Sequence, residues 1–226
     1  MIKTAFTILM VAASILGMAQ DSTSHERLTI KFSLLAVANL NTPCLQPGLE
    51  YRFLPKWSIQ AEYGFQANKI PSYSFHDQRH DWKYYRIKTE LRHYLPSRKA
   101  DRIFWGIEYF KVGQTYSKLN GILYLPNGAG HYSYSRSDIR RNSWGLMGKF
   151  GFSFWNEKRF WGEVVIGLGY KKLSIRHNLY DPVFDAYTSL REFSFARDLE
   201  AADWHSIHFS YELKFGYILL AKASHQ

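Results

Sequence analysis

Acidic and basic side chains recur at every second position along several segments of this chain, a pattern that could support proton chemistry. Between Gly48 and Gln66, the residues Glu50, Arg52 and Glu62 share one parity, and the opposite parity is apolar and aromatic. Carboxylates buried beside basic groups can have shifted pKa values and act in acid/base reactions. The same arrangement also suits a structural interior made of ion pairs, which is the interpretation we favour.

Charged residues of this parity recur in the predicted strands, so their side chains should meet in one interior. An unpaired charge in a narrow interior is strongly penalised, so each should have a partner of opposite sign. The predicted charge network consists of Lys31, Glu50, Arg52, Glu62, Arg86, Lys88, Glu90, Arg92, Glu108, Lys149, Glu163, Glu212 and Lys214. Glycines of the same parity should leave room for the long basic side chains.

Two histidine–serine pairs could take part in nucleophilic catalysis. His131 and Ser133 lie in a stretch rich in Gly, Ser and Tyr, and His205 directly precedes Ser206. A serine nucleophile needs a histidine base within hydrogen-bond reach and a third group that orients the histidine. Neither pair has an identifiable orienting carboxylate, so a loop or rim position without a catalytic role is favoured.

One polar segment contains a cluster of residue types that bind metals. His76, Asp77, His80 and Asp81 offer imidazole and carboxylate ligands, but a solvated loop is the favoured interpretation. The sequence therefore predicts no metal site, and it indicates no cofactor. Cys44 is the only cysteine, so it cannot form an intramolecular disulfide, and it is interpreted as an incidental thiol in the first loop.

Alternation with a period of two indicates strands as the elements that carry these residues. Eight strands are predicted, at residues 27–38, 48–54, 57–66, 83–95, 102–114, 140–155, 160–171 and 204–221. The second, fourth and sixth connections are short, and the third, fifth and seventh are long. Residues 68–82, 115–139 and 174–203 are predicted to be the long loops.

The first tight hairpin fixes a register through the parity of its residues. Partners across a hairpin point to the same side of the sheet, so Phe53 should pair with Trp57 across a three-residue turn that contains Pro55. This register places Glu50 opposite Gln60.

The pattern predicts an all-β fold: an eight-stranded antiparallel up-and-down transmembrane β-barrel with short periplasmic turns and long extracellular loops. Aromatic residues gather near strand ends, and the apolar face has almost no mid-strand charges, each of which would cost about 2–4 kcal/mol in lipid. His93, Lys111 and Lys172 are exceptions near strand ends. A soluble lipocalin-like barrel, with its apolar residues inside, is the alternative, and side-chain direction decides between them.

A barrel of eight strands has an interior that side chains fill, so a mixed-sign interior is expected to be closed. A structural or surface-interaction protein with no defined activity is the favoured function. The alternatives are an enzyme at the barrel rim that modifies envelope lipid and a narrow pore. The predicted state is a monomer.

The first residues resemble an export signal. Lys3 precedes an apolar run, and small residues follow it, which predicts a signal peptide at residues 1–19 with cleavage after Ala19 and a barrel domain at residues 20–226. The formal charge of the chain is +10, with basic residues scattered along strands and loops. That distribution argues against nucleic acid and favours lipopolysaccharide and outer-membrane lipid as partners.

Two segments carry a resemblance to a known family: Pro47–Phe65 (PGLEYRFLPKWSIQAEYGF) and Tyr84–Leu95 (YYRIKTELRHYL). They resemble a family of small outer-membrane β-barrel proteins found in Bacteroidetes and catalogued as a domain of unknown function. That resemblance implies a barrel fold and supplies no catalytic residues. The last strand, with Lys214, Gly216 and Leu219, is similar to the signal that the barrel assembly machinery binds during insertion.

Overall fold

The computed structural model describes residues 26–37, 39, 42–66, 79–95, 103–125, 130–157, 159–186 and 200–221. All regular structure in these segments is β-strand, and none of them contains a helix long and apolar enough to cross a membrane. The strands are β1 (Glu26–Ser33), β2 (Cys44–Leu45), β3 (Pro47–Leu54), β4 (Trp57–Gln66), β5 (His80–Tyr94), β6 (Ile103–Tyr124), β7 (His131–Glu157), β8 (Phe160–Tyr180), β9 (Val183–Asp185) and β10 (Asp203–Ala221).

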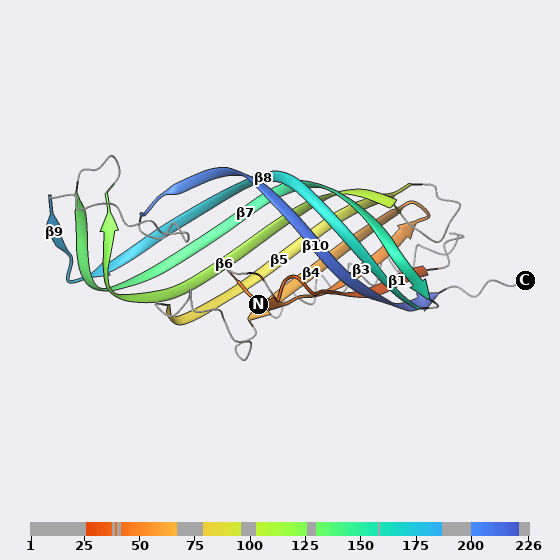
Figure 1. Ribbon diagram of the computed structural model, residues 1–226, viewed down its shortest axis with the longest axis horizontal. Coiled ribbons are helices and arrows are strands. Elements are labelled where there is room, and N and C mark those ends of the chain that lie inside the picture. Colours follow the sequence, from red (N-terminus) through yellow and green to blue (C-terminus); the bar gives the residue numbers. More distant parts are fainter. Residues whose placement is uncertain are drawn as a thin grey trace, which may run out of the picture.

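The long strands form a ring of antiparallel pairs. β3 pairs with β4, and pairing then follows the chain through β5, β6, β7 and β8 to β10. β10 and β3 both pair with β1, so the hydrogen bonds return to the first strand. Figure 1 shows these strands side by side and tilted along an elongated body, with β9 at the opposite end from the C-terminal end of β10.

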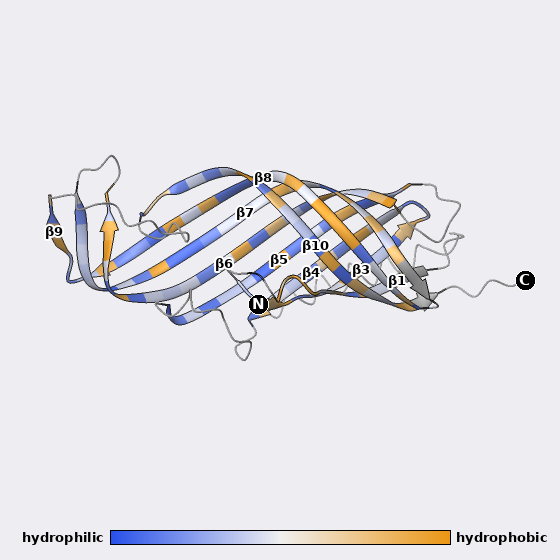
Figure 2. Cartoon of the chain, in the orientation of Figure 1, coloured by the Kyte–Doolittle hydropathy of each residue, from blue (hydrophilic) through white to orange (hydrophobic). Residues whose placement is uncertain are grey.

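Side chains alternate between the two faces of the ring, with charged groups inside. Glu90 is 2% exposed, whereas its neighbour Leu91 is 43% exposed. Ile107 and Ile166 are likewise exposed, next to the fully buried Glu108 on one strand and to Val165 on the other. Figure 2 shows the resulting alternation of hydrophilic and hydrophobic residues along the strands. This direction is the opposite of the one expected for the soluble alternative.

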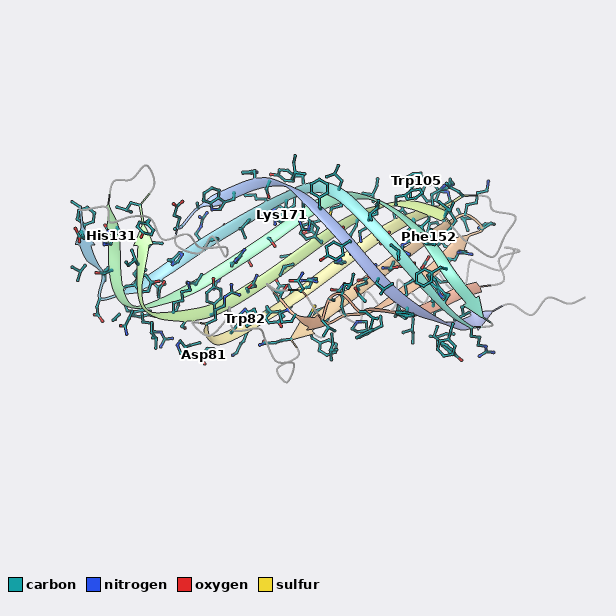
Figure 3. All side chains as sticks on the ribbon, in the orientation of Figure 1. Asp81, Trp82, Trp105, His131, Phe152 and Lys171 are labelled. Carbon is teal, nitrogen blue, oxygen red and sulfur yellow. The ribbon has the colours of Figure 1, made fainter. Side chains whose placement is uncertain are left out.

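The exposed apolar side chains form a band around one part of the ring. It includes Leu49, Ile59, Ile87, Leu91, Ile107, Leu146, Phe150, Ile166, Leu168, Phe209 and Tyr211, and we call it the apolar band. Aromatic pairs border the band. Trp57 packs against Trp105 at one edge, with ring centroids 5.9 Å apart, and Trp144 packs against Tyr170 at the other, 6.1 Å apart. Trp105 and His131 lie toward opposite ends of the molecule (Figure 3).

Three strands continue well beyond the apolar band, which corrects the predicted loops. Residues 115–124 and 131–139 extend the β6–β7 hairpin, and β8 continues to Tyr180. We call residues 115–124, 131–141 and 173–180 the extension. Its inner face holds a buried apolar cluster together with polar residues such as Ser137, and its outer face is mostly polar. Because polar residues occur on both faces, the alternation in sequence is weak. The buried cluster consists of Tyr116, Ile139, Leu173 and Ile175.

The β3–β4 hairpin confirms one predicted pair and corrects another. Glu50 lies opposite Gln60, as predicted, but Leu54 and not Phe53 is the partner of Trp57. A register shift between Arg52 and Leu54 accommodates Phe53 as an extra residue. The turn is therefore two residues long, and the bulge keeps the parity of both strands.

The connection after β1 folds into the ring. Ala36 and Cys44 are buried, and the backbone N–H of Cys44 donates to the carbonyl of Ala36 at 3.0 Å. The N–H of Ser33 donates to the carbonyl of Gln46 at 3.1 Å. The described part of the predicted first loop, at Thr42 and Cys44, thus lies in the interior, and its buried backbone groups find partners there.

Candidate functional site

The charge network centres on Arg92, whose guanidinium is fully buried. It donates two hydrogen bonds to Glu90, at 2.8 and 2.9 Å, and two to Glu163, at 2.9 and 3.1 Å. Lys31 donates to the same Glu163 at 3.0 Å and pairs with Glu50. Paired, charge-assisted contacts of this kind offset the cost of burying the ions.

A second group of ion pairs joins three lysines around Glu212. Lys149 and Lys214 lie 2.8 and 2.7 Å from its carboxylate oxygens, and Lys88 contacts it as well. Lys149 also pairs with Glu108, and Lys214 with Glu62. Lys149 and Lys214 reach Glu90 at 3.8 and 4.0 Å, which connects this group to Arg92.

Neutral side chains complete the surroundings of the ions. Ser58 and Tyr94 donate to Glu50, while the amides of Gln46 and Gln60 donate to Glu62. Two rings lie under the cations: Phe104 is 4.2 Å from Arg92, and Trp161 is 4.4 Å from Lys31. Ions, amides and rings therefore fill this part of the ring.

The expectation that every charge has an opposite partner is wrong for Arg52 and Arg86 among the described residues. Arg52 lies near the end of its strand, with its guanidinium over the ring of Tyr94 at 4.2 Å. Arg86 donates to the Gln46 amide oxygen at 3.3 Å, to the Thr42 carbonyl at 3.4 Å and to the Thr42 hydroxyl. The inward-folded connection thus supplies neutral oxygens where the sequence predicted a carboxylate.

Interior glycines make room for rings as well as for charged chains. A Cβ on Gly167 would lie 3.2 Å from the Cγ of Lys149, a basic side chain as predicted, and one on Gly106 would meet Glu90. A Cβ on Gly216 would lie 2.5 Å from the indole nitrogen of Trp161, and one on Gly151 would overlap Phe104. The rings that stack on the cations therefore depend on these glycines.

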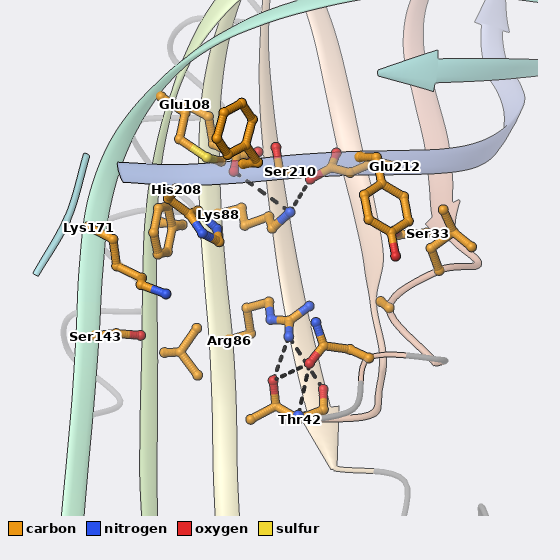
Figure 4. A pocket seen from close by; sticks show the side chains of 18 of the residues that line it. Ser33, Thr42, Arg86, Lys88, Glu108, Ser143, Lys171, His208, Ser210 and Glu212 are labelled. Atoms are coloured by element: carbon orange, nitrogen blue, oxygen red, sulfur yellow. Dashed lines mark hydrogen bonds and ion pairs between the residues drawn. The ribbon is translucent and has the colours of Figure 1, made fainter. Parts of the chain in front are cut away.

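A cavity of about 390 Å³ lies between the charge network and the extension. Its lining includes Lys88, Glu108 and Glu212 from the network and Leu173 from the buried cluster of the extension. Figure 4 shows Arg86, Lys88, Lys171 and His208 arranged around this space. We call it the interior cavity.

The structure does not bring together either predicted histidine–serine pair. His205 is exposed and contacts the Tyr170 hydroxyl, whereas Ser206, the next residue, points to the other face. His131 is buried, with Nε2 3.9 Å from Asp185, while the exposed Ser133 donates to the Val183 carbonyl at 3.4 Å.

A different serine meets a histidine. The Oγ of Ser137 lies 3.1 Å from the Nδ1 of His177, across the β7–β8 pair. Sequence reasoning missed this contact because both residues fall in segments predicted to be loops. If the predicted strands are extended to these residues, both side chains have inward parity, and their contact could have been predicted. Ser137 is fully buried, so it is not positioned as a nucleophile.

The predicted cluster of possible metal ligands is only partly described by the structure. His76 and Asp77 lie outside the described residues, and His80 and Asp81 are exposed at the start of β5. In the described part of the chain, no three His, Cys, Asp or Glu side chains gather as metal ligands.

Cys44 is completely buried, with Sγ 3.7 Å from Gln46, so it belongs to the interior and not to a surface loop. His93 packs between Trp57 and Trp105, at centroid distances of 4.7 and 5.4 Å.

A family model described as "Protein of unknown function (DUF3575)" matches residues 5–190. This chain belongs to the DUF3575 family. The DUF3575 chain is also similar to a solved structure, that of Acinetobacter baumannii CarO, at 8% identity and a TM-score of 0.37. The similarity covers 88% of this chain and 100% of the other. No curated protein matches it.

Proposed function

We propose that this DUF3575 protein is an eight-stranded outer-membrane β-barrel, closed by its charge network, with a structural or surface-interaction role. The observation that carries the proposal is the direction of the side chains. Glu90, Arg92 and Glu163 are buried inside the ring, while Leu91, Ile107 and Ile166 face outward. A water-exposed protein gains nothing from this arrangement, whereas lipid outside the ring would solvate the apolar band.

The dimensions of the strands support a membrane location. β4 has 10 residues and β5 has 15, and a tilted strand needs about 9–11 residues to cross the hydrocarbon layer. The pairs Trp57–Trp105 and Trp144–Tyr170 lie where the two membrane interfaces would be. Closing the ring pairs the backbone groups of neighbouring strands, except on the β1 side of β10 before Leu213, and so limits the unpaired groups in lipid.

The extension supports an outward-facing role. In an exported chain that starts in the periplasm, the long hairpin of β6 and β7 would project from the cell surface. At the Trp144–Tyr170 edge and beyond it, the outward-facing residues include the exposed basic side chains of Lys111, Arg140 and Arg176. They would meet lipopolysaccharide phosphates at that height. A signal peptide at residues 1–19, insertion by the barrel assembly machinery, a monomeric state and a bacterial host among the Bacteroidetes complete the proposal.

Cell fractionation tests the proposal. The protein should be recovered in the outer-membrane fraction and should migrate differently on a mild-detergent gel before and after heating. A protease-cleavable site placed after Asn120, in the extension, should be cut on intact cells, whereas one placed after Lys56 should not. Recovery as a soluble periplasmic monomer would contradict the proposal. Steady single-channel conductance in planar bilayers would show that the interior is a pore and would contradict the proposed closed interior.

A further inference from the structure

The described residues that line the interior cavity carry more positive than negative charge. Among them, Arg86, Lys88, Arg141 and Lys171 contribute basic groups, against two carboxylates, those of Glu108 and Glu212. Both carboxylates also contact Lys149, which lies in the charge network beneath the cavity. A low-dielectric space with this balance favours a negatively charged occupant.

Arg86 offers a donor group suited to such an occupant. Its side chain is buried, its hydrogen-bond partners are the neutral oxygens of Thr42 and Gln46, and no described carboxylate lies within 4.0 Å of it. A guanidinium has five N–H donors in a plane that matches a carboxylate or a phosphate. The buried hydroxyl of Ser210 also lines the cavity and has no hydrogen-bond partner among the described residues.

The cavity also reaches the edge of β10. It contacts His208 and Ser210, which point inward, and Phe209 and Tyr211, which point outward. The cavity therefore borders β10 along residues 208–211. On this side β1 ends at Ser33, opposite Lys214, the N–H of Leu34 donates to the carbonyl of Leu213 at 3.0 Å, and no described strand pairs with β10 between Asp203 and Glu212.

The outward residues at this edge are the most exposed apolar side chains in the described structure. Ile207 is 74% exposed, and Phe209 and Tyr211 are each 75% exposed. They continue the apolar band along the part of β10 that lines the cationic cavity. One molecule with an acidic head and an apolar tail would therefore match both surfaces at once.

We propose that the interior cavity binds a single-chain anionic amphiphile, with its carboxylate or phosphate near Arg86 and Lys171 and its acyl chain lying over Phe209 and Tyr211. The proposed outer-membrane location would supply such a molecule from the surrounding lipid. Only the supply of the amphiphile from membrane lipid rests on the proposed function. The binding itself can be measured on purified protein.

Native mass spectrometry of the full-length mature protein, released from a neutral detergent, tests the binding. Palmitate and palmitoyl-lysophosphatidic acid are added separately, and their retention is compared with that of hexadecanol, octanoate and inorganic phosphate. We expect retention of one or both charged sixteen-carbon ligands. The one retained more strongly identifies a carboxylate or a phosphate head.

Adjacent residues on opposite faces provide matched variants. Lys171→Gln and Arg141→Gln remove cations from the cavity, whereas Lys172→Gln and Arg140→Gln remove cations from the outer surface. The cavity variants should weaken retention about tenfold or more, as expected for the loss of one charge-assisted contact, and the surface variants should leave it unchanged. Phe209→Ser should reduce the preference for palmitate over octanoate, and Phe150→Ser, elsewhere in the apolar band, should not.

Three results would overturn the proposal. Hexadecanol could be retained as well as palmitate, which would remove the role of the charge. Inorganic phosphate could displace both charged ligands completely at equal concentration, which would remove the role of the chain. Lys171→Gln and Arg141→Gln could both bind like the parent protein while showing the same heat-modifiable migration. Heat-modifiable migration reports the folding of each variant independently of ligand retention. A failure of the membrane proposal can therefore be distinguished from a failure of the binding proposal.

Discussion

Arg92 and Glu163 face each other across the interior of the ring through two hydrogen bonds, 2.9 and 3.1 Å long. They belong to β5 and β8, which are separated in the ring by β6 and β7. Their contact therefore crosses the interior and does not follow the wall. It ties together two parts of the sheet that share no backbone hydrogen bonds.

Removing one member of this contact should destabilise the protein more than removing both. Arg92→Met leaves Glu163 and Glu90 without their bidentate partner, and breaking a buried ion pair in this way costs about 3–5 kcal/mol. The double variant Arg92→Met/Glu163→Met removes a cation and an anion together, and Glu90 keeps Lys149 and Lys214. Urea unfolding of the detergent-solubilised protein measures both, and a double variant less stable than Arg92→Met would contradict the argument.

A charge placed on the apolar band should impair membrane insertion. Ile59→Lys and Ile166→Lys each place an ammonium on the lipid side, at a cost of about 2–4 kcal/mol near the middle of the membrane. Folding yield into lipid vesicles, followed by heat-modifiable migration, measures the effect. Leu119→Lys is the control because Leu119 is exposed in the extension, and equal yields for all three variants would rule out a lipid-facing band.

Cys44 should report the integrity of the interior. Its thiol is completely buried in the folded protein, so a water-soluble maleimide should label it only after unfolding. Ser135→Cys, made in a Cys44→Ser background, introduces an exposed thiol on the extension that should react at once. Mass spectrometry gives the labelled fractions, and rapid labelling of Cys44 in the folded protein would show that the interior is open to water.

The extension should lose local order in acid. Asp138 accepts hydrogen bonds from Ser117 at 2.8 Å, Arg136 at 2.9 Å and Tyr180 at 3.1 Å, which joins β6, β7 and β8. The hydrogen bond from Ser117, followed by that from Arg136, lowers the pKa of Asp138 below its usual value. This stabilisation is complete above the unfolded value, about 3.9, and is lost as the pH falls through the lower folded value.

Hydrogen exchange at pH 6 and at pH 3, corrected for intrinsic rates, tests this dependence. Peptides that cover Ser117 and Tyr180 should lose protection at the lower pH. Asp138→Asn should exchange at similar corrected rates at both pH values. A parent protein whose extension is equally protected at both would show that Asp138 does not hold these strands together.

Sequence parity predicted the faces of the strands wherever charged and apolar residues alternate. Glu90 and Leu91 lie on the sides expected from their positions, and the contacts of Arg92 could be foreseen as a group although not pair by pair. Parity cannot specify which strands face one another across the interior. That depends on tilt and on the whole order of pairing.

The errors arose where side chains of similar polarity occupy both faces. Ser117 and Asp138 lie in strands, but the residues around them have no charge contrast, so the segment was predicted to be a loop. The connection through Thr42 and Cys44 has Asn and Pro, which indicate a turn but not its direction. Its inward course depends on Arg86, which donates to Thr42 from 44 positions later in the sequence.

The brevity of β1 has a kinetic consequence. This strand joins β3 over five register partners and β10 over seven, whereas the β6–β7 pairing runs from Ile103 to Tyr124. Openings of a sheet start where the fewest ladder bonds must break, so transient separation should begin on the two sides of β1. The ring would then unzip from its first strand, while the hairpins that carry the extension remained intact as the slowest part to unfold.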